Sequence, residues 1–163
     1  MEDRFKETSA EFLGSFLRRI QECVGRLSED EVWWRANPAV NSAGNLLLHL
    51  RGNLSQWVLE GLGGLSYERH RDQEFAEKGP LPKAELLASL ERVVGECQRV
   101  IRGLSAEDLR RPRDIQGQGT DGVYTVQHVV EHMSYHTGQI VQITKELRGP
   151  EGGIEFYPQH RGK

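Results

Sequence analysis

Cysteine is scarce in this sequence, and long apolar runs are absent. The 163 residues include only Cys23 and Cys97, which are too few and too far apart for a disulfide framework. Mean hydropathy is −0.59, and no apolar run approaches the ~20 residues of a membrane-spanning helix. The charged start MEDRFKE lacks the apolar region of a secretory signal. We therefore expect a cytoplasmic protein without a membrane partner, in which both cysteines are reduced core residues.

An excess of positive charge is missing as well. The chain has 21 Lys and Arg against 24 Asp and Glu, which gives a formal net charge of −3. Broad nucleic-acid binding needs a basic face, so we expect no nucleic-acid partner. The length is typical of one domain and suffices to bury a core without disulfides.

Apolar residues recur at helical spacing in four long segments. These segments cover residues 2–27, 41–62, 82–103 and 125–147. Asn41 or Ser42 can cap the second segment, and Pro82 occupies a favoured first position of the third. No segment alternates strongly enough to indicate a strand. The pattern predicts an all-α helix bundle over residues 1–150, followed by a C-terminal tail over 151–163.

A polar stretch, residues 67–80, separates the second and third predicted helices. Connections of this length are uncommon unless they are functional or cross over the domain. We therefore expect a surface loop that makes one long crossover connection between helices 2 and 3.

Three of the six histidines, His128, His132 and His136, lie four residues apart on the fourth predicted helix. Residues at this spacing share a helix face, so neighbouring ones can bind the same metal ion. The apolar residues of this helix mark its buried direction at about 100° per residue. His136 lies near the middle of that direction, His132 at its edge, and His128 almost perpendicular to it. The favoured pair of ligands is therefore His132 and His136.

A third ligand has to come from another helix, and His49 on the second predicted helix is the candidate. Three imidazoles with one open position are the usual arrangement of a catalytic metal site. All-imidazole ligation suits Zn, Ni, Cu or Fe. The residues alone leave an alternative equally open, in which these histidines are hydrogen-bonded core residues that bind no metal. We expect His70 and His160 to be solvated.

Asn53, Tyr135 and Gln139 are the candidates for substrate contacts or for hydrogen bonds to the ligands, because they lie close to the histidines along the helices. The histidine pair is not an H-E-x-x-H protease motif, because Met133 stands where that motif has its glutamate. Metal-assisted hydrolysis is therefore the weaker alternative. The sequence assigns no catalytic residue.

Two motifs resemble the DinB/YfiT-like family. The stretch NSAGNLLLHLRGNL, residues 41–54, resembles its second helix, and HMSYHTGQI, residues 132–140, resembles its fourth-helix signature H-x-x-x-H-x-G-Q. The glycines at 63–64 and the segment RHRDQEF, residues 69–75, resemble a subgroup of these proteins. The resemblance extends from about Phe5 to Leu147.

The resemblance implies an antiparallel four-helix bundle that binds Zn or Ni through His49, His132 and His136 and often forms a homodimer. Several relatives are S-transferases that use a low-molecular-weight thiol, such as bacillithiol, mycothiol or glutathione, against an electrophile. On that function Arg69 and Arg71 are candidates to bind the carboxylates of the thiol. The alternatives are a non-catalytic, stress-related metal-binding module and a metal-dependent hydrolase.

Overall fold

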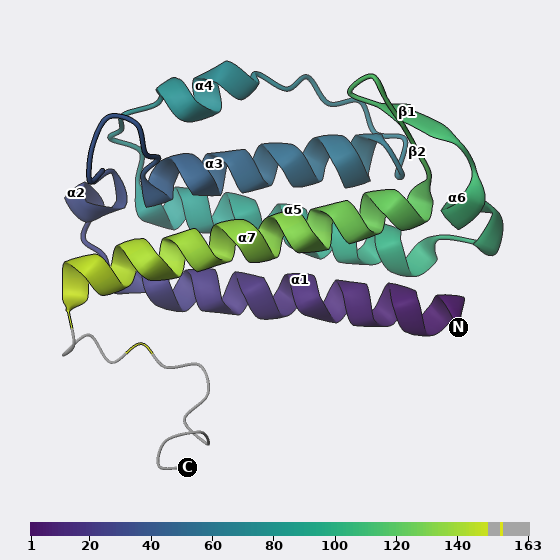
Figure 1. Cartoon of the computed structure of the whole chain (residues 1–163), viewed down its shortest axis with the longest axis horizontal. Helices are drawn as coiled ribbons and strands as arrows, with labels where there is room; N and C mark the ends of the chain where they lie inside the picture. The colour runs from purple at the N-terminus through teal and green to yellow at the C-terminus, as the bar shows by residue number, and fades with distance from the viewer. Residues whose placement is uncertain (150–153, 155–163) are drawn as a thin grey trace, which may run out of the picture.

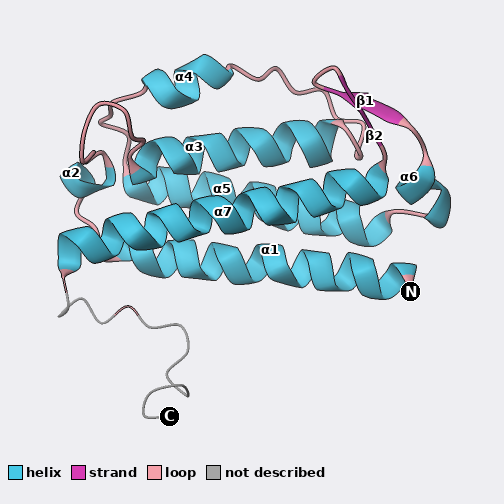
Figure 2. Cartoon of the chain, viewed as in Figure 1, coloured by secondary structure: helices cyan, strands magenta, loops and turns pink. Residues whose placement is uncertain are grey.

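The chain folds into four long helices with short elements between them in this computed structural model, which describes residues 1–149 and 154 (Figures 1 and 2). The long elements are α1 (Glu2–Gly25), α3 (Ala43–Leu54) with its π-helical continuation η1 (Ser55–Glu60), α5 (Lys83–Gly103) and α7 (Gly122–Arg148). The short ones are α2 (Glu29–Val32), α4 (Arg71–Ala76), α6 (Ala106–Arg110), β1 (Arg113–Ile115) and β2 (Gln118–Thr120). The predicted all-α bundle is confirmed. Apart from residue 154, the predicted tail lies outside the described residues.

The path of the chain between η1 and α5 determines the topology. In Figure 1, α3 and α5 run in the same direction, opposite to α1 and α7, so the chain crosses the length of the bundle between them. The predicted crossover connection is confirmed, but its description as a loop is wrong over Arg71–Ala76, which form α4. This helix has no apolar stripe, and Glu74 is its buried residue. Hydrophobic periodicity therefore does not reveal it.

The start of α3 is fixed by a capping box that also fastens the crossover connection. Ser42 Oγ accepts a hydrogen bond from the Asn45 backbone N–H, and Asn45 Oδ1 accepts one from the Ser42 N–H, both at 3.2 Å. Asn45 Nδ2 donates to the carbonyl oxygens of Glu74 and Glu77 at 2.9 and 2.8 Å. Arg35 donates to Asn45 Oδ1 at 2.7 Å. The first turn of α3 thereby holds the backbone of the α4 segment in place.

The apolar faces of the four long helices meet in one core. Cys23 and Cys97 lie inside it, fully buried and free of a disulfide, as predicted. Burial raises the pKa of Cys23 to about 11 and raises the pKa of Cys97 as well. Phe12, one of the apolar residues that recur at helical spacing in the first segment, does not belong to this core: its side chain is 49% exposed and stacks on Phe16.

A short hairpin that the sequence did not predict covers one end of the bundle. Strands β1 and β2 pair antiparallel, with Arg113 opposite Thr120, around a two-residue turn in which Gln116 and Gly117 have φ of 59° and 74°. The strands have three residues each, and Ile115 is their buried side chain, so alternation is too short to detect.

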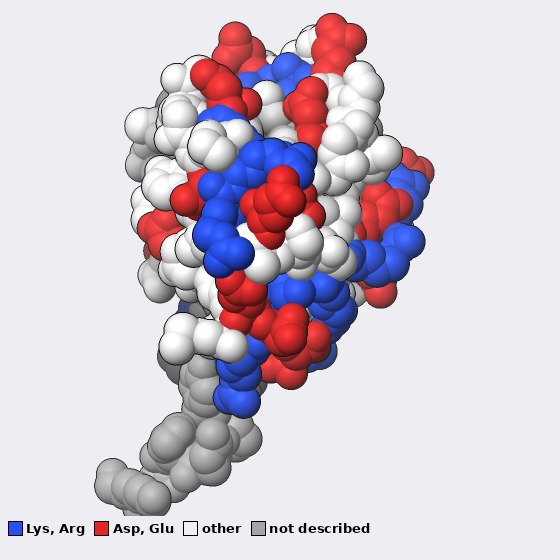
Figure 3. Space-filling model, turned by 90° about the vertical axis from the view of Figure 1, so that its right-hand side faces the viewer, with Lys and Arg blue, Asp and Glu red and all other residues white. Residues whose placement is uncertain are grey.

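Figure 3 shows that this end of the molecule carries Lys and Arg interleaved with Asp and Glu. Within the described residues, the helices lack the combination of length and apolar character that a bilayer crossing needs.

Candidate metal centre

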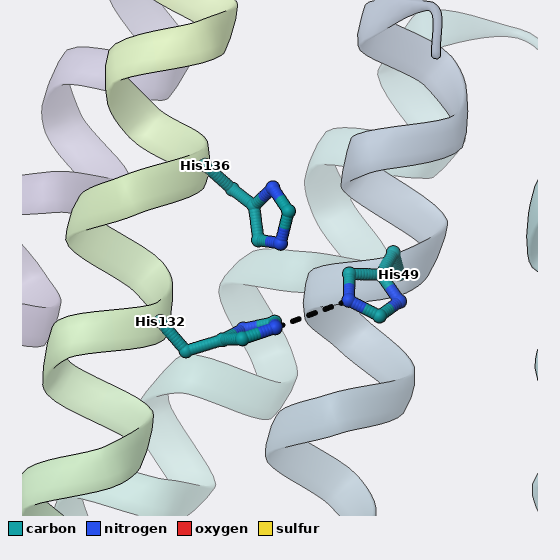
Figure 4. A group of neighbouring side chains, drawn as sticks. All are labelled: His49, His132 and His136. Carbon is teal, nitrogen blue, oxygen red and sulfur yellow. Dashed lines mark hydrogen bonds between the residues drawn. The ribbon is translucent and has the colours of Figure 1, made fainter. Parts of the chain in front are cut away.

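The three histidines selected from the sequence converge between α3 and α7. His49 comes from α3, and His132 and His136 come from successive turns of α7 (Figure 4). One ring nitrogen from each lies within 4.8 Å of the others, and the Nε2 atoms of His49 and His132 are 3.1 Å apart. The side chains of His49 and His136 are largely withdrawn from solvent, at 5% and 9% exposure. His70 is exposed on the crossover connection, as predicted, and His160 lies outside the described residues.

Hydrogen bonds at the outer ring nitrogens orient two of these imidazoles. His49 Nδ1 lies 2.9 Å from Glu74 Oε2, and His136 Nδ1 lies 2.6 Å from Gln139 Oε1. Because both partners are acceptors, each Nδ1 carries the proton and each Nε2 keeps its lone pair. Gln139, one of the residues singled out from the sequence, therefore contacts a candidate ligand directly. His132 Nδ1 is buried and has no hydrogen-bond partner among the described residues.

Glu74 is itself held by a buried arginine. Arg69 donates from Nε and Nη2 to the two carboxylate oxygens of Glu74, both at 2.8 Å, and the two side chains are 4% and 7% exposed. Burial would raise the pKa of Glu74, but the hydrogen bonds from Arg69 and His49 outweigh burial and lower it. Glu74 is thus a carboxylate at neutral pH. Arg69 Nη2 also lies 3.1 Å from His49 Nδ1, but both nitrogens carry protons that point to Glu74, so this contact is not a hydrogen bond.

Arg69 and Glu74 are the residues of this site whose roles the sequence did not reveal. The expectation that Arg69 is free to bind a thiol carboxylate is wrong, because Glu74 and Gln56 occupy its guanidinium. Arg71 is exposed, and its guanidinium lies 5.0 Å from the ring centre of Phe75. The one available signal was the unusual length of the polar connection that carries Arg69 and Glu74.

Gly52 makes room for this ion pair on the surface of α3. A Cβ atom built on Gly52 would lie 2.0 Å from Glu74 Oε1 and 3.0 Å from Arg69 Nε. A larger side chain at this position and the observed place of Glu74 are therefore incompatible. Gln56, one turn further along, accepts a hydrogen bond from Arg69 at 3.2 Å and another from Gln116 at the tip of the hairpin.

The surroundings of the cluster favour the uncharged form of its imidazoles. Burial, reinforced by the neighbouring His136 and His49, lowers the pKa of His132 to about 3. Burial also lowers the pKa of His136, although the hydrogen bond to Gln139 opposes this shift. At neutral pH these two rings are therefore uncharged, which is the state that binds a metal ion.

The remaining sequence candidates are not among the three clustered histidines. His128 is half-buried against the ring of Trp57, with ring centres 4.2 Å apart, which agrees with its predicted place off the ligand face. Burial lowers the pKa of His128 as well. Asn53 is buried, and its Oδ1 has no hydrogen-bond partner within the described part of the chain. Tyr135 is 62% exposed, and its ring meets His136 edge-on at 5.1 Å.

Comparison with known proteins agrees with this architecture. A conserved protein from Enterococcus faecalis has a similar structure, with a TM-score of 0.70 and 18% sequence identity over 85% of this chain and 94% of that chain. A DinB-like protein from Bacillus cereus gives a TM-score of 0.63 and 17% identity over 83% of this chain and 90% of that one. At these identities the likeness shows a shared fold.

The sequence itself matches one family along almost its whole length. No curated protein matches this sequence. The family described as "Protein of unknown function (DUF1572)" matches residues 3–153. The chain therefore belongs to the DUF1572 family and has the fold of the DinB-like proteins.

Proposed function

We propose that this protein binds a divalent metal ion, Zn or Ni, through the Nε2 atoms of His49, His132 and His136. The observation that carries the proposal is the convergence of three imidazole nitrogens within 4.8 Å of one another from two helices. The 3.1 Å between His49 Nε2 and His132 Nε2 is close to the roughly 3.4 Å between two nitrogens bound at about 2.1 Å to a tetrahedral ion. The buried, unpartnered Nδ1 of His132 can carry the proton when its Nε2 binds metal. The donor set therefore fits such an ion.

The residues around the ligands favour a preorganised site. Glu74 and Gln139 accept hydrogen bonds from the outer nitrogens of His49 and His136, and such contacts orient the rings and strengthen them as ligands. Three protein ligands leave a coordination position for an exogenous molecule, which is typical of catalytic rather than structural sites.

As the reaction we propose transfer of a low-molecular-weight thiol, of the bacillithiol, mycothiol or glutathione kind, to an electrophile. A bound divalent ion supplies positive charge that lowers the pKa of a thiol. An external thiol is required because Cys23 and Cys97 are fully buried with raised pKa values and offer no thiolate. A cavity of about 340 Å³ has Trp34 and Leu46 in its wall, together with Gln139, which connects it to His136 of the cluster, and it can receive the apolar part of an electrophile.

Two other functions use the same centre. A non-catalytic metal-binding module needs only the three histidines. A metal-dependent hydrolase additionally needs a general base. In the described part of the chain, Glu74 is the carboxylate that contacts the cluster, and Arg69 and His49 already bind both of its oxygens. This arrangement favours thiol transfer over hydrolysis.

Metal analysis of the purified protein tests the centre. We expect about one ion per chain in the wild type and its loss in His49→Ala, His132→Ala and His136→Ala. The matched controls are His70→Ala, on the exposed connection, and His128→Ala, on the same helix as two of the ligands, and both should keep the ion. Unchanged stoichiometry in the three ligand variants would contradict the centre.

Cobalt-substituted protein separates thiol transfer from simple metal storage. We expect bacillithiol, mycothiol or glutathione to produce a thiolate-to-cobalt charge-transfer band, and the same thiol to be consumed with a model electrophile by the zinc or nickel form. A fully loaded protein that gives neither signal with any of the three thiols would instead be a non-catalytic module.

Assembly as a homodimer and location in the cytoplasm stay predictions. Phe12 and Tyr135, both strongly exposed on neighbouring helices α1 and α7, line a common hollow that offers apolar surface for a second copy. Sedimentation equilibrium should give twice the mass of the chain, and a monomer mass would refute the dimer.

A further inference from the structure

A second cavity, of about 490 Å³, lies between α3, α5 and the crossover connection. Arg51 of α3 and Arg92 of α5 contribute to its wall, together with Glu68, Glu74 and Glu77 of the connection. The three histidines of the metal centre do not line it. This cavity is therefore separate from the candidate metal centre, with Glu74 forming part of the partition between them.

Two of the three acidic side chains of this wall, those of Glu74 and Glu77, already have hydrogen-bond partners. Both oxygens of Glu74 are bound as described above. Glu77 Oε1 accepts hydrogen bonds from the backbone N–H groups of the next two residues, both at 2.9 Å. The third, Glu68, points largely into solvent, and its Oε1 lies 3.7 Å from Nε2 of His70. None of these carboxylates pairs with the arginines across the cavity.

The two arginines have no such partners. Within the described residues, neither Arg51 nor Arg92 makes a hydrogen bond or an ion pair. Arg51 Nε is buried without an acceptor, whereas Arg92 is exposed at the mouth of the cavity it lines. Buried donors of charged groups are normally satisfied, so the buried, unpartnered Nε of Arg51 at the wall of this cavity indicates a missing acceptor. Guanidinium groups bind carboxylates and phosphates with paired, charge-assisted hydrogen bonds.

We propose that this cavity binds a small molecule through an oxyanion, a carboxylate or a phosphate, held by Arg51 and Arg92. Tyr67 and Ser89 line the same space and can add neutral hydroxyl donors. Leu48 and Val93 give the wall an apolar portion that can contact the rest of the ligand. The volume falls within the usual range of small-molecule sites.

Thermal unfolding of the purified, metal-loaded protein tests this site, with inorganic phosphate and succinate as probes and NaCl of equal ionic strength as the reference. A ligand that binds only the folded state raises the Tm, and the rise grows with the ratio of its concentration to its Kd. We expect phosphate, succinate or both to raise the Tm above the NaCl value, and the effective probe identifies the preferred oxyanion. No stabilisation by either probe would overturn the proposal.

Substitutions assign the effect to the two arginines. Arg51→Gln and Arg92→Gln should each raise the Kd of the effective probe about tenfold or more, the usual effect of losing a charge-assisted contact. Arg99→Gln is the matched control, because Arg99 is an exposed arginine of α5 that does not line the cavity. Equal Kd values for Arg51→Gln, Arg92→Gln and the wild type would place the probe elsewhere and refute the site.

Two further measurements separate this site from the metal centre. Probe binding should persist in His136→Ala, which removes a candidate metal ligand without touching the cavity wall. Binding that disappears in His136→Ala but persists in Arg51→Gln would mean that the anion sits on the metal, and would overturn the proposal. In wild-type protein the Nε–Hε NMR signal of Arg51 should shift on titration with the probe, a readout that does not depend on any variant folding.

Discussion

Replacing Gly52 by alanine is expected to destabilise the protein, although alanine is the better helix former. The new Cβ would lie 2.0 Å from Glu74 Oε1, whereas ordinary contact begins at 3.4 Å, so the carboxylate has to retreat by the difference, 1.4 Å. Glu74 is bound by Arg69 at 2.8 Å and by His49 at 2.9 Å. A shift of this size takes at least one of these bonds beyond hydrogen-bond distance.

The two opposing energies can be compared directly. Exchange of glycine for alanine inside a helix contributes about 0.5–1 kcal/mol of stability. Separation of a buried ion pair costs about 3–5 kcal/mol, because it leaves uncompensated charge inside the protein. We therefore expect Gly52→Ala to lower the free energy of unfolding by about 2–4 kcal/mol. For a chain of this size that corresponds to roughly 4–16 °C in Tm.

Gly95→Ala is the matched control for this prediction. Gly95 lies inside α5, and a Cβ built on it would meet nothing within 4 Å. This variant should gain about 0.5–1 kcal/mol, because it receives the helix propensity without the clash. Urea and thermal unfolding of metal-free protein measure both effects without interference from metal binding. Equal stabilisation of the two variants would refute the role assigned to Glu74.

Three further predictions concern the buried polar and thiol groups. Glu74→Gln should weaken metal binding about 10–100-fold, because it removes the charged acceptor that orients His49. The control Glu68→Gln, on the exposed part of the same connection, should leave the Kd for the metal unchanged. The stability that ionised Glu74 contributes, because its folded pKa is lowered, should be complete above its ordinary pKa of 4.5 and decline as the pH falls through the folded value. The difference between wild type and Glu74→Gln in urea unfolding should therefore be constant near neutral pH and shrink in acid, and a difference that grows in acid would contradict this sign. Cys23 and Cys97 should resist a thiol reagent at pH 8 in folded protein and react promptly after unfolding in urea, because burial raises both pKa values.

The long helices and the histidine cluster could be predicted because both follow from a regular period. A repeat of 3.6 residues fixes the direction in which each side chain leaves the helix, so the apolar stripe of the fourth helix already separated His132 and His136 from His128. The apolar stripe of the second predicted helix likewise indicates the inner face of α3, where His49 lies. Phe12 shows the limit of this reasoning, because it recurs at helical spacing with the core residues of α1 and is nevertheless 49% exposed.

The parts that could not be predicted depend on contacts between distant segments. The α4 segment has no apolar period, and its place is set by Asn45 and by the space above Gly52, more than twenty residues earlier in the chain. Each strand of the β1–β2 hairpin has only three residues, and the turn between them needs a positive φ at Gln116 as well as at Gly117. Local propensity carries little information in such segments, because tertiary contacts decide their conformation.

The crossover topology and the arrangement of the metal centre are physically connected. Because α3 and α5 run in the same direction, the chain has to return over the length of the bundle, and it does so across α3, the helix that carries His49 (Figure 1). This return places Glu74 against the outer nitrogen of His49, with Arg69 from the same segment balancing its charge. A tight turn between two antiparallel helices would leave His49 Nδ1 without a carboxylate, and its ring free to rotate. The unusual length of the connection therefore allows Glu74, a residue of this segment, to orient His49, a ligand of the candidate centre.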